Sequence, residues 1–225
     1  MIKEPLNIIL TGASGMVGEG ILLACLANNS IESVLSIVRK PTSRQHPKLK
    51  ELVVSDFLQL DQWKQELKDY DACFYAAGKT SLGMKEDDYH QLTYTVTLAV
   101  ANVLHHVNPD LVFCFVSGAH TDATETGKVM WARIKGKTEN ALTHLFQANT
   151  YHFRPALMKP MKGQTQFFGY NYITHKVLYP VMSLFYPGCS LEEIAKAMIV
   201  CSQHGFGKQI LEVKDIRQAA SSYQS

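Results

Sequence analysis

The stretch LNIILTGASGMVG, residues 6–18, decides the fold of this 225-residue chain. Its first six residues, Leu6–Thr11, are largely apolar and predict a buried β-strand. A glycine-rich turn follows the strand. The residues after the turn, Met16–Ala27, predict a helix that ends at the polar run beginning with Asn28. A strand, a glycine turn and a helix in this order are typical of the first unit of a nucleotide-binding α/β fold.

The spacing of the three glycines in the turn carries a specific chemical prediction. Gly12 permits a tight turn, Gly15 lets the backbone approach a pyrophosphate closely, and Gly18 lets the helix pack near the strand. The amino end of the helix offers free N–H groups and a positive dipole end to phosphates. The turn lacks the Gly-Lys-Ser/Thr sequence of NTPase phosphate loops. We therefore expect a dinucleotide to contact Gly12, Ser14, Gly15, Met16, Val17 and Gly18.

Short β-rich runs alternate with longer helical patterns along the rest of the chain. Strands that are apolar on both faces and separated by helices are typical of a parallel sheet covered on both sides. Right-handed crossovers then predict an α/β, doubly wound parallel sheet with strand order 3-2-1-4-5-6 and a crevice at the carboxyl ends of strands one and four. The later strands are expected at residues 33–38, 51–55, 71–77, 110–117 and 151–157, with 210–213 as a candidate short seventh strand. The later helices are expected at residues 61–68, 87–106, 129–147 and 190–203.

Two of these helices carry capping signals. Asp61 is the expected N-cap of the helix over 61–68. Ser190 and Glu193, three residues apart, form an expected capping box for the helix over 190–203. No linker divides the chain, so we expect a single domain over residues 1–225, with residues 159–189 as an irregular, aromatic-rich insert over the crevice. The aromatic rings of this insert can line a substrate cleft, and the alternative is that they cover the sheet or form an oligomer face.

Composition excludes several classes of protein. Apolar residues make up 46% of the chain and charged residues 19%, which excludes a disordered chain. A formal charge of +2 argues against a dedicated nucleic-acid binder. The five cysteines include no CxxC pair, and three fall in apolar runs, which suits buried thiols in a reducing, cytoplasmic compartment. No leader, no membrane span and no metal-ligand spacing are expected.

The end of the second strand predicts the type of cofactor. An acid there would bind the adenosine ribose 2′-hydroxyl, but the chain has Arg39 and Lys40 instead. A guanidinium can hold a 2′-phosphate bidentately, which favours NADP over NAD. The alternative is that both cations are simply solvated. Asp56 and Phe57 close the third strand and can contact the adenine, although Asp56 can equally cap a helix.

These features together resemble the short-chain dehydrogenase/reductase superfamily, and most closely its atypical branch that includes the Tat-interacting oxidoreductase. The matching segments are TGASGMVG (11–18), Ser55-Asp56-Phe57, Ala76-Ala77-Gly78, Phe115-Val116-Ser117 and Arg154-Pro155. The resemblance implies a Rossmann domain that binds NADP(H) and a small-molecule substrate. It also implies cofactor contacts from Ala76, Ala77, Gly78 and Pro155.

The resemblance further implies a catalytic Tyr-x-x-x-Lys pair on the helix after strand five, where one turn separates the two side chains. In this chain Lys135 matches the lysine, which would bind the nicotinamide ribose, but Trp131 stands in place of the tyrosine. An indole does not ionise at working pH and cannot serve as the general acid. Of the residues just past strand five, Ser117 alone matches the family serine.

Replacement acids are available in the sequence. His120 lies just past strand five and has a suitable pKa range. Tyr89 and Tyr94 lie near the start of the long helix. For each of them the alternative is a purely structural place, on the surface for the histidine and in side-chain packing for the tyrosines.

Three hypotheses follow. The first is an NADP-dependent oxidoreductase with Lys135, Ser117 and His120 as candidate catalytic residues and a small, apolar substrate. The second is a catalytically impaired NADP-binding sensor or partner-binding protein, motivated by Trp131. The third is an isomerase or lyase that uses the cofactor transiently. The chain is expected to be a monomer or a homodimer paired through the helices over 87–106 and 129–147.

Overall fold

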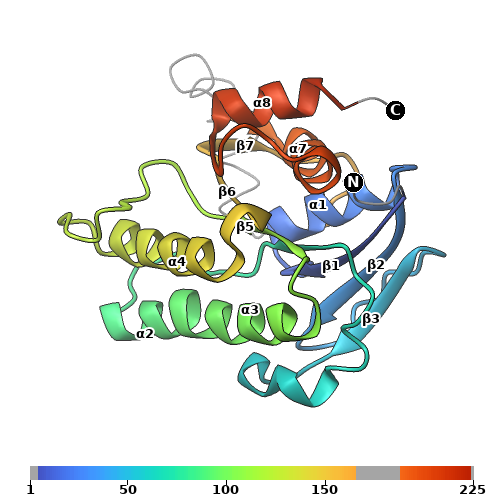
Figure 1. The fold of residues 1–225 in the computed structure, drawn as a ribbon, viewed down its shortest axis with the longest axis horizontal. Helices are drawn as coiled ribbons and strands as arrows, with labels where there is room; N and C mark the ends of the chain where they lie inside the picture. Colours follow the sequence, from blue (N-terminus) through green and yellow to red (C-terminus); the bar gives the residue numbers. More distant parts are fainter. Residues whose placement is uncertain (1–4, 166–187, 224–225) are drawn as a thin grey trace.

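The computed structural model describes residues 5–165 and 188–223, and its core is a parallel sheet of seven strands (Figure 1). Their order is β3-β2-β1-β4-β5-β6-β9. Every neighbouring pair runs parallel. The strands are β1 (Leu6–Thr11), β2 (Ile31–Val38), β3 (Leu49–Val53), β4 (Ala72–Tyr75), β5 (Val112–Val116), β6 (Thr150–Arg154) and β9 (Ile210–Glu212). The predicted α/β doubly wound sheet, its order 3-2-1-4-5-6 and its short seventh strand are confirmed.

Helices cover both faces of this sheet, as Figure 1 shows. One face carries α1 (Met16–Leu26), α7 (Leu191–His204) and α8 (Val213–Ser221). The other face carries α2 (Glu86–His90), α3 (Val96–Val107) and α4 (Met130–Phe146). The buried apolar residues accordingly fall into two clusters, one on each side of the sheet.

The period-two alternation of a strand explains how one sheet fills both clusters. On β4, Phe74 belongs to the cluster under α1 and α7, while Cys73 and Tyr75 belong to the cluster under α3 and α4. On this second face the ring of Phe113 lies 5.7 Å from the ring of Tyr75 and 5.0 Å from that of Phe146, centroid to centroid. Full burial of one such ring stabilises the fold by roughly 1.5–3 kcal/mol. The strands are therefore held from both sides.

The helix predicted over residues 61–68, with Asp61 as N-cap, is wrong. A 3₁₀ helix, η1 (Phe57–Trp63), takes its place, and turns follow it. Its N-cap is Asp56, whose carboxylate accepts a hydrogen bond from the backbone N–H of Leu58 at 3.0 Å. Because this cap lies three residues after the end of β3, the helix begins at Phe57, four residues before the predicted start, and Leu60 is buried from within it.

The long helix predicted over residues 87–106 is present with a wide turn inside it. Between α2 and α3 lies a π-helical turn, η2 (Gln91–Thr95). Such turns interrupt α-helices rarely and often lie at functional sites. This turn borders both cavities described below, through Leu92 and Thr93.

The chain after β6 departs from the prediction at Pro155. The predicted strand over 151–157 ends at Arg154, because proline has no N–H for the ladder. A short two-stranded parallel sheet follows, formed by β7 (Leu157–Lys159) and β8 (Gly188–Ser190). This small sheet, the 3₁₀ helix η3 (Gln147–Asn149) and α8 were not predicted. The capping box of Ser190 and Glu193 at the start of α7 is confirmed.

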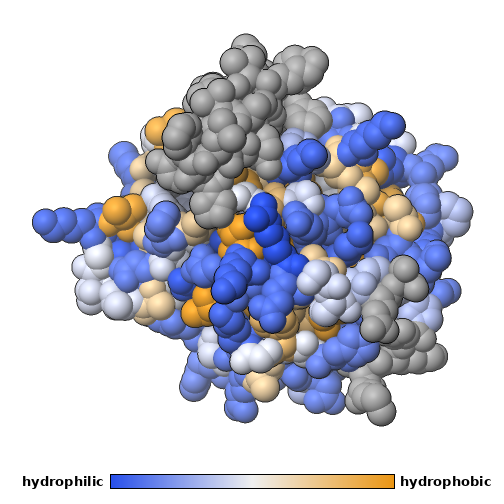
Figure 2. All heavy atoms as spheres, turned by 90° about the horizontal axis from the view of Figure 1, so that it is seen from above, coloured by the Kyte–Doolittle hydropathy of each residue, from blue (hydrophilic) through white to orange (hydrophobic). Residues whose placement is uncertain are grey.

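Most of the expected insert over 159–189 lies outside the described residues, so its role as a substrate cleft stays a prediction. Outside the residues drawn in grey, the face in Figure 2 is mostly hydrophilic, with small, separated hydrophobic patches. All five cysteines are free and buried. In the described part of the chain, no helix has both the length and the apolar character needed to cross a membrane.

Candidate functional site

The glycine turn between β1 and α1 packs against the carboxyl end of β4. Gly12 has a φ of +80°, and a Cβ there would lie 2.6 Å from backbone atoms of Ala76 and Ala77. A Cβ on Gly18 would lie 2.1 Å from the carbonyl oxygen of Gly12. Real Cβ atoms do not approach backbone this closely. The packing of the protein itself therefore requires glycine at both positions.

Gly15 is under no such constraint. It has a φ of −105°, and a Cβ there would meet only the carbonyl oxygen of Gly12, at an ordinary 3.4 Å. Gly15 is the N-cap of the eleven-residue helix α1, and no side chain among the described residues caps this helix. The open space at Gly15 and the uncapped helix end together suit an anionic group that approaches the backbone.

A cavity of about 490 Å³ lies over this turn. Its walls come from the glycine turn, the ends of β2 and β3, the segment after β4 and two residues of the π turn and α3. They are Gly12, Ser14, Gly15, Ile37, Val38, Arg39, Ser55, Asp56, Phe57, Tyr75, Ala76, Ala77, Gly78, Lys79, Leu92 and Val96. Arg39 and Asp56 are exposed, and Asp56 also accepts a hydrogen bond from the Gln59 side chain at 3.3 Å. Asp56 thus caps η1 while it lines the cavity.

A second cavity, of about 380 Å³, lies on the other side of the glycine turn. It is lined by Met16, Val17, Ala76, Ala77, Gly78, Lys79, Thr80, Tyr89, Thr93, Thr97, Phe115, Val116, Ser117, Lys135 and Met158. Four residues after β4, numbered 76–79, line both cavities. The two cavities therefore adjoin each other across the carboxyl ends of β2, β1, β4 and β5.

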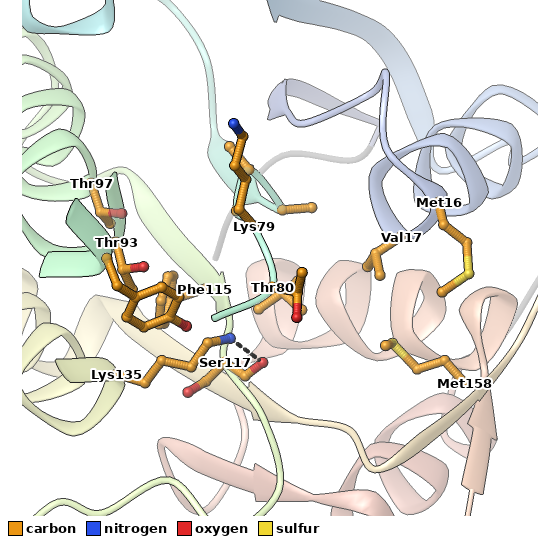
Figure 3. Close-up of a pocket in the computed structure, with 15 residues that line it drawn as sticks. Met16, Val17, Lys79, Thr80, Thr93, Thr97, Phe115, Ser117, Lys135 and Met158 are labelled. Carbon is orange, nitrogen blue, oxygen red and sulfur yellow. Dashed lines mark hydrogen bonds between the residues drawn. The ribbon is translucent and has the colours of Figure 1, made fainter. Parts of the chain in front are cut away.

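Figure 3 shows how the second cavity is built. Thr93, Thr97 and Phe115 lie on one side, and Met16, Val17 and Met158 lie on the other. Lys135 and Ser117 lie between them, joined by a hydrogen bond that Lys135 Nζ donates to the main-chain oxygen of Ser117 at 2.7 Å. One wall is thus apolar and thioether-rich, and the other carries hydroxyl groups.

The hydroxyl proton of Ser117 is used in a hydrogen bond to Thr121 and is not available to a ligand. Thr121 Oγ1 donates to the carbonyl oxygen of Gly118 at 2.8 Å and lies 3.0 Å from Ser117 Oγ. Because the Thr121 proton is engaged with Gly118, Ser117 Oγ is the donor in the bond between the two hydroxyls. In this arrangement Ser117 offers the cavity lone pairs.

Trp131 lies beside the cavity and does not line it. A Cβ on Gly118 would meet the Trp131 ring at 3.7 Å and Lys135 Nζ at 3.9 Å, so both side chains flank Gly118. The second turn of α4 therefore brings Lys135 to the cavity as the sequence spacing predicts. The indole of Trp131 packs beside Gly118, outside the cavity lining.

The structure brings most of the predicted site residues together. The predicted residues that line one or both cavities are Gly12, Ser14, Gly15, Met16, Val17, Arg39, Asp56, Phe57, Ala76, Ala77, Gly78, Ser117 and Lys135. Those that line neither are Gly18, Lys40, His120 and Pro155. Gly18 lies under the turn, and Lys40 is exposed. The contribution of each residue to binding or catalysis stays a prediction.

His120 is exposed, with a left-handed φ of +66°. Pro155 is buried, and its carbonyl oxygen accepts the N–H of Ala119 at 3.0 Å. Pro155 thus fixes the segment that follows β5. Neither residue lines either of the two cavities.

Sequence reasoning named Tyr89 as a candidate acid but missed Thr93 and Thr97, which complete the hydroxyl wall of the second cavity. Tyr89, Thr93 and Thr97 are spaced by four residues and all line it. The four-residue spacing of polar residues in a predicted amphipathic helix was the available signal, because such residues share one helix face. Three buried polar groups on one helix face need hydrogen-bond partners, from the protein or from a ligand.

The family model described as "NAD dependent epimerase/dehydratase family" matches residues 8–129, more than half of the chain. The chain belongs to this family. The match covers the glycine turn, the ends of β2 to β5 and the π turn, and it ends before α4, which carries Trp131 and Lys135.

Two solved structures and one curated protein are similar to the chain. WbmF of Bordetella bronchiseptica in complex with NAD+ has a TM-score of 0.68 at 15% identity, covering 97% of this chain and 77% of that one. A short chain dehydrogenase from Burkholderia cenocepacia in complex with NADP has a TM-score of 0.65 at 14% identity, covering 99% and 95%. The Leucinostatins biosynthesis cluster protein T of Purpureocillium lilacinum is 27% identical over 143 residues, 62% of this chain. That alignment spans about half, 52%, of the curated relative.

The residues present fit the NAD(P) cofactor that is typical of the family. The glycine turn leaves open space at Gly15 before an uncapped helix end, which a pyrophosphate suits. The two adjoining cavities provide one compartment on each side of this turn, as a dinucleotide requires. Among the residues that the structure describes, no group of three or more His, Cys, Asp or Glu side chains is arranged to hold a metal ion.

Proposed function

We propose that this protein is an NADP(H)-dependent oxidoreductase that acts on a small, apolar carbonyl or alcohol substrate. The observation that carries the proposal is the place of Arg39, directly after β2 and on the wall of the larger cavity. An acid at this position would repel a 2′-phosphate, whereas a guanidinium can bind it bidentately. The choice of NADP over NAD rests on this one residue.

Each part of the cofactor has a matching group in the chain. The pyrophosphate would lie on the turn from Gly12 to Val17, and the 2′-phosphate would contact Arg39. The adenine would lie near Asp56 and Phe57. The nicotinamide half would occupy the smaller cavity, where Lys135 would donate a hydrogen bond to its ribose. When bound, the cofactor supplies or accepts a hydride.

The chain's own residues then set the conditions for the reaction. Met16, Val17 and Met158 provide an apolar wall that excludes water and suits an apolar substrate. Lys135 brings a cation to the hydroxyl wall, and Ser117 offers lone pairs. A cation beside a developing oxyanion stabilises it. We retain the atypical branch, a cytoplasmic location and a monomeric or homodimeric state as parts of the same proposal.

One observation favours a second candidate, a catalytically impaired NADP-binding sensor. Trp131 packs by Gly118 and presents no ionisable group to the cavity. Trp131→Tyr should create reductase activity in such a protein, and robust wild-type activity would exclude it. The family match also leaves room for an isomerase or lyase, which would form product without net change in NADPH absorbance.

The cofactor assignment is tested by calorimetric titration of the purified chain with NADPH and NADH. We expect NADPH to bind at least about tenfold more tightly, since a lost charged hydrogen bond costs about 1.5–3 kcal/mol. Arg39→Ala should remove most of the preference and leave NADH affinity unchanged. Arg217→Ala, on exposed α8 away from both cavities, is the matched control. Equal affinities for the two nucleotides in the wild-type chain would defeat the assignment.

A further inference from the structure

We infer that Tyr89 is the general acid of this protein, supplying from α2 the proton that Trp131 cannot supply from α4. The inference rests on the proposed function, and it deepens that function by naming the residue that protonates the substrate oxygen. It follows from the contents of the smaller cavity and from the way α2 is held against α4.

Few side chains on the walls of this cavity can donate a proton to a substrate. The ionisable groups on its walls are Lys79, Tyr89 and Lys135. Lys79 is exposed, whereas Tyr89 is only 2% exposed. The threonine hydroxyls are too weakly acidic at working pH, and the Ser117 proton is engaged with Thr121. Lys135 Nζ is engaged with the main-chain oxygen of Ser117 at 2.7 Å, and the phenol of Tyr89 is the same chemical group as the absent tyrosine.

The position of Tyr89 is fixed against the helix that carries Lys135. Arg133 on α4 binds both carboxylate oxygens of Glu86 on α2, at 2.8 and 2.9 Å. One turn further along both helices, Lys137 Nζ lies 3.2 Å from His90 Nε2. Two contacts on successive turns hold α2 in register with α4, and Tyr89 lies between the two α2 partners in the sequence.

The π turn keeps the hydroxyl wall aligned. In an ideal α-helix, residues four apart drift by roughly 40° around the axis, so Tyr89 and Thr97 would diverge by roughly 80°. The wider π turn between them rotates the chain less per residue and reduces this drift. Tyr89, Thr93 and Thr97 consequently line one cavity. Thr93 forms a hydrogen bond with Tyr89, and Thr97 forms one with Tyr75.

The pKa of Tyr89 is set by its surroundings, so that a charged cofactor beside it would change how readily it gives up its proton. Burial raises the pKa of Tyr89, and the hydrogen bond with Thr93 opposes this rise. The phenol therefore keeps its proton until charge arrives beside it. An oxidised nicotinamide ring is cationic, and a cation at close range lowers a phenol pKa.

The proposed step balances as follows for reduction of a carbonyl. The substrate carbon forms a new C–H bond with the hydride that the reduced cofactor supplies, and the π electron pair of the C=O bond moves to oxygen. That oxygen forms an O–H bond with the proton of Tyr89, whose own O–H bond breaks. The substrate is reduced and the cofactor is oxidised. The phenolate of Tyr89 then regains a proton from solvent.

The first test is an ultraviolet titration of tyrosinate absorbance with saturating NADP+ and with saturating NADPH. We expect a tyrosine in the wild-type chain to titrate about one pKa unit or more lower with NADP+ than with NADPH. This shifted component should vanish in Tyr89→Phe. It should persist in Tyr94→Phe, because Tyr94 lies outside the cavity against Lys137 and His90. A Tyr89-independent shift, or no shift, would overturn the inference.

Calorimetry on the same samples separates the two failures. If neither nucleotide binds, the proposed function fails. If NADP+ binds to the wild-type chain and to Tyr89→Phe alike, and no component assignable to Tyr89 moves, this inference fails while cofactor binding stands.

A kinetic test uses a panel of aromatic aldehydes and quinones as probes. We expect Tyr89→Phe to lower kcat by about 100-fold or more with NADPH affinity unchanged. The double variant Tyr89→Phe/Trp131→Tyr should regain part of this activity, because it restores a phenol one turn from Lys135. Undiminished kcat in Tyr89→Phe would overturn the inference.

Discussion

The Nζ atom of Lys135 donates a hydrogen bond to the main-chain oxygen of Ser117 at 2.7 Å, which ties α4 to the end of β5. The same atom lies 5.9 Å from the centroid of the Phe115 ring. Burial lowers the pKa of Lys135 to about 8, and the carboxylate of Glu139, one turn along α4, opposes this shift. The cavity therefore holds a lysine that titrates close to neutral pH.

This pKa makes a prediction about stability at alkaline pH. Between about pH 8 and pH 10.5 the unfolded chain keeps the Lys135 proton and the folded chain does not, so stability rises with pH in this window. We expect the unfolding free energy of the wild-type chain, relative to Lys135→Met, to rise by about 2 kcal/mol from about pH 8 to pH 10. Urea unfolding at several pH values measures this difference. The exposed Lys128→Met is the control, and a flat difference for Lys135→Met would contradict the assignment.

Two glycines of the turn serve different purposes: Gly18 is required by the packing of the protein, and Gly15 leaves space for a ligand. A Cβ on Gly18 meets backbone at 2.1 Å, whereas one on Gly15 meets none closer than 3.4 Å. We expect Gly18→Ala to lower the unfolding free energy by about 2–3 kcal/mol. Gly15→Ala should cost less than about 1 kcal/mol, the usual effect at an N-cap. Gly15→Ala should nevertheless weaken NADPH binding at least about tenfold, as judged by calorimetry. Unaltered NADPH affinity in Gly15→Ala would contradict the assignment of the pyrophosphate to this turn.

The sequence was most informative where local and long-range signals agree. The stretch over β1, the glycine turn and α1 predicts its own structure because apolar burial, glycine geometry and helix periodicity coincide there. The strand order then follows from crossover handedness. The region around η1 was misjudged because a single cap, Asp56, outweighed the polar pattern that pointed to Asp61. The helix-capping role that the sequence left open for Asp56 is the one the structure shows, and Leu60 is buried within the resulting helix.

The residues of the larger cavity were predictable from the sequence, and those of the smaller cavity were less so. The residues around Gly12, Arg39 and Ala76 follow strand ends, which meet at one edge of a parallel sheet. Tyr89 comes from a helix whose face depends on a π turn, and a π turn has no reliable signal in a single sequence. The four-residue spacing of Tyr89, Thr93 and Thr97 indicates a shared helix face, but which cavity that face lines follows only from the placement of α2 and α3 in the fold.

A buried ion pair predicts a large stability effect away from the cavities. Arg154 Nε donates to Glu139 at 3.0 Å, and both residues are almost fully buried. Removing one partner leaves an unpaired buried charge, which costs about 3–5 kcal/mol. We therefore expect Arg154→Met to lower the unfolding free energy by this amount. Arg217→Met should change it by less than about 0.5 kcal/mol, because Arg217 lies 4.0 Å from Glu193 at the surface. Similar small losses in both variants would contradict the assigned importance of the pair.

His152 makes the chain sensitive to acid. Its Nε2 atom lies 2.8 Å from Thr143 Oγ1, and its buried Nδ1 has no partner among the described residues. Burial lowers the pKa of His152 to about 4; the carboxylate of Glu139 raises it and Arg154 lowers it further.

The unfolded chain binds a proton at this histidine below about pH 6.5, while the folded chain does not until about pH 4, so stability falls as pH drops through this window. His152→Gln keeps a partner for Thr143 and removes the titration. We expect the wild-type chain to lose about 3 kcal/mol relative to His152→Gln between about pH 7 and pH 4. The exposed His144→Gln should leave the acid profile unchanged, and chemical unfolding across this range measures both. An acid profile of His152→Gln that parallels the wild type would show that the proton is taken up elsewhere.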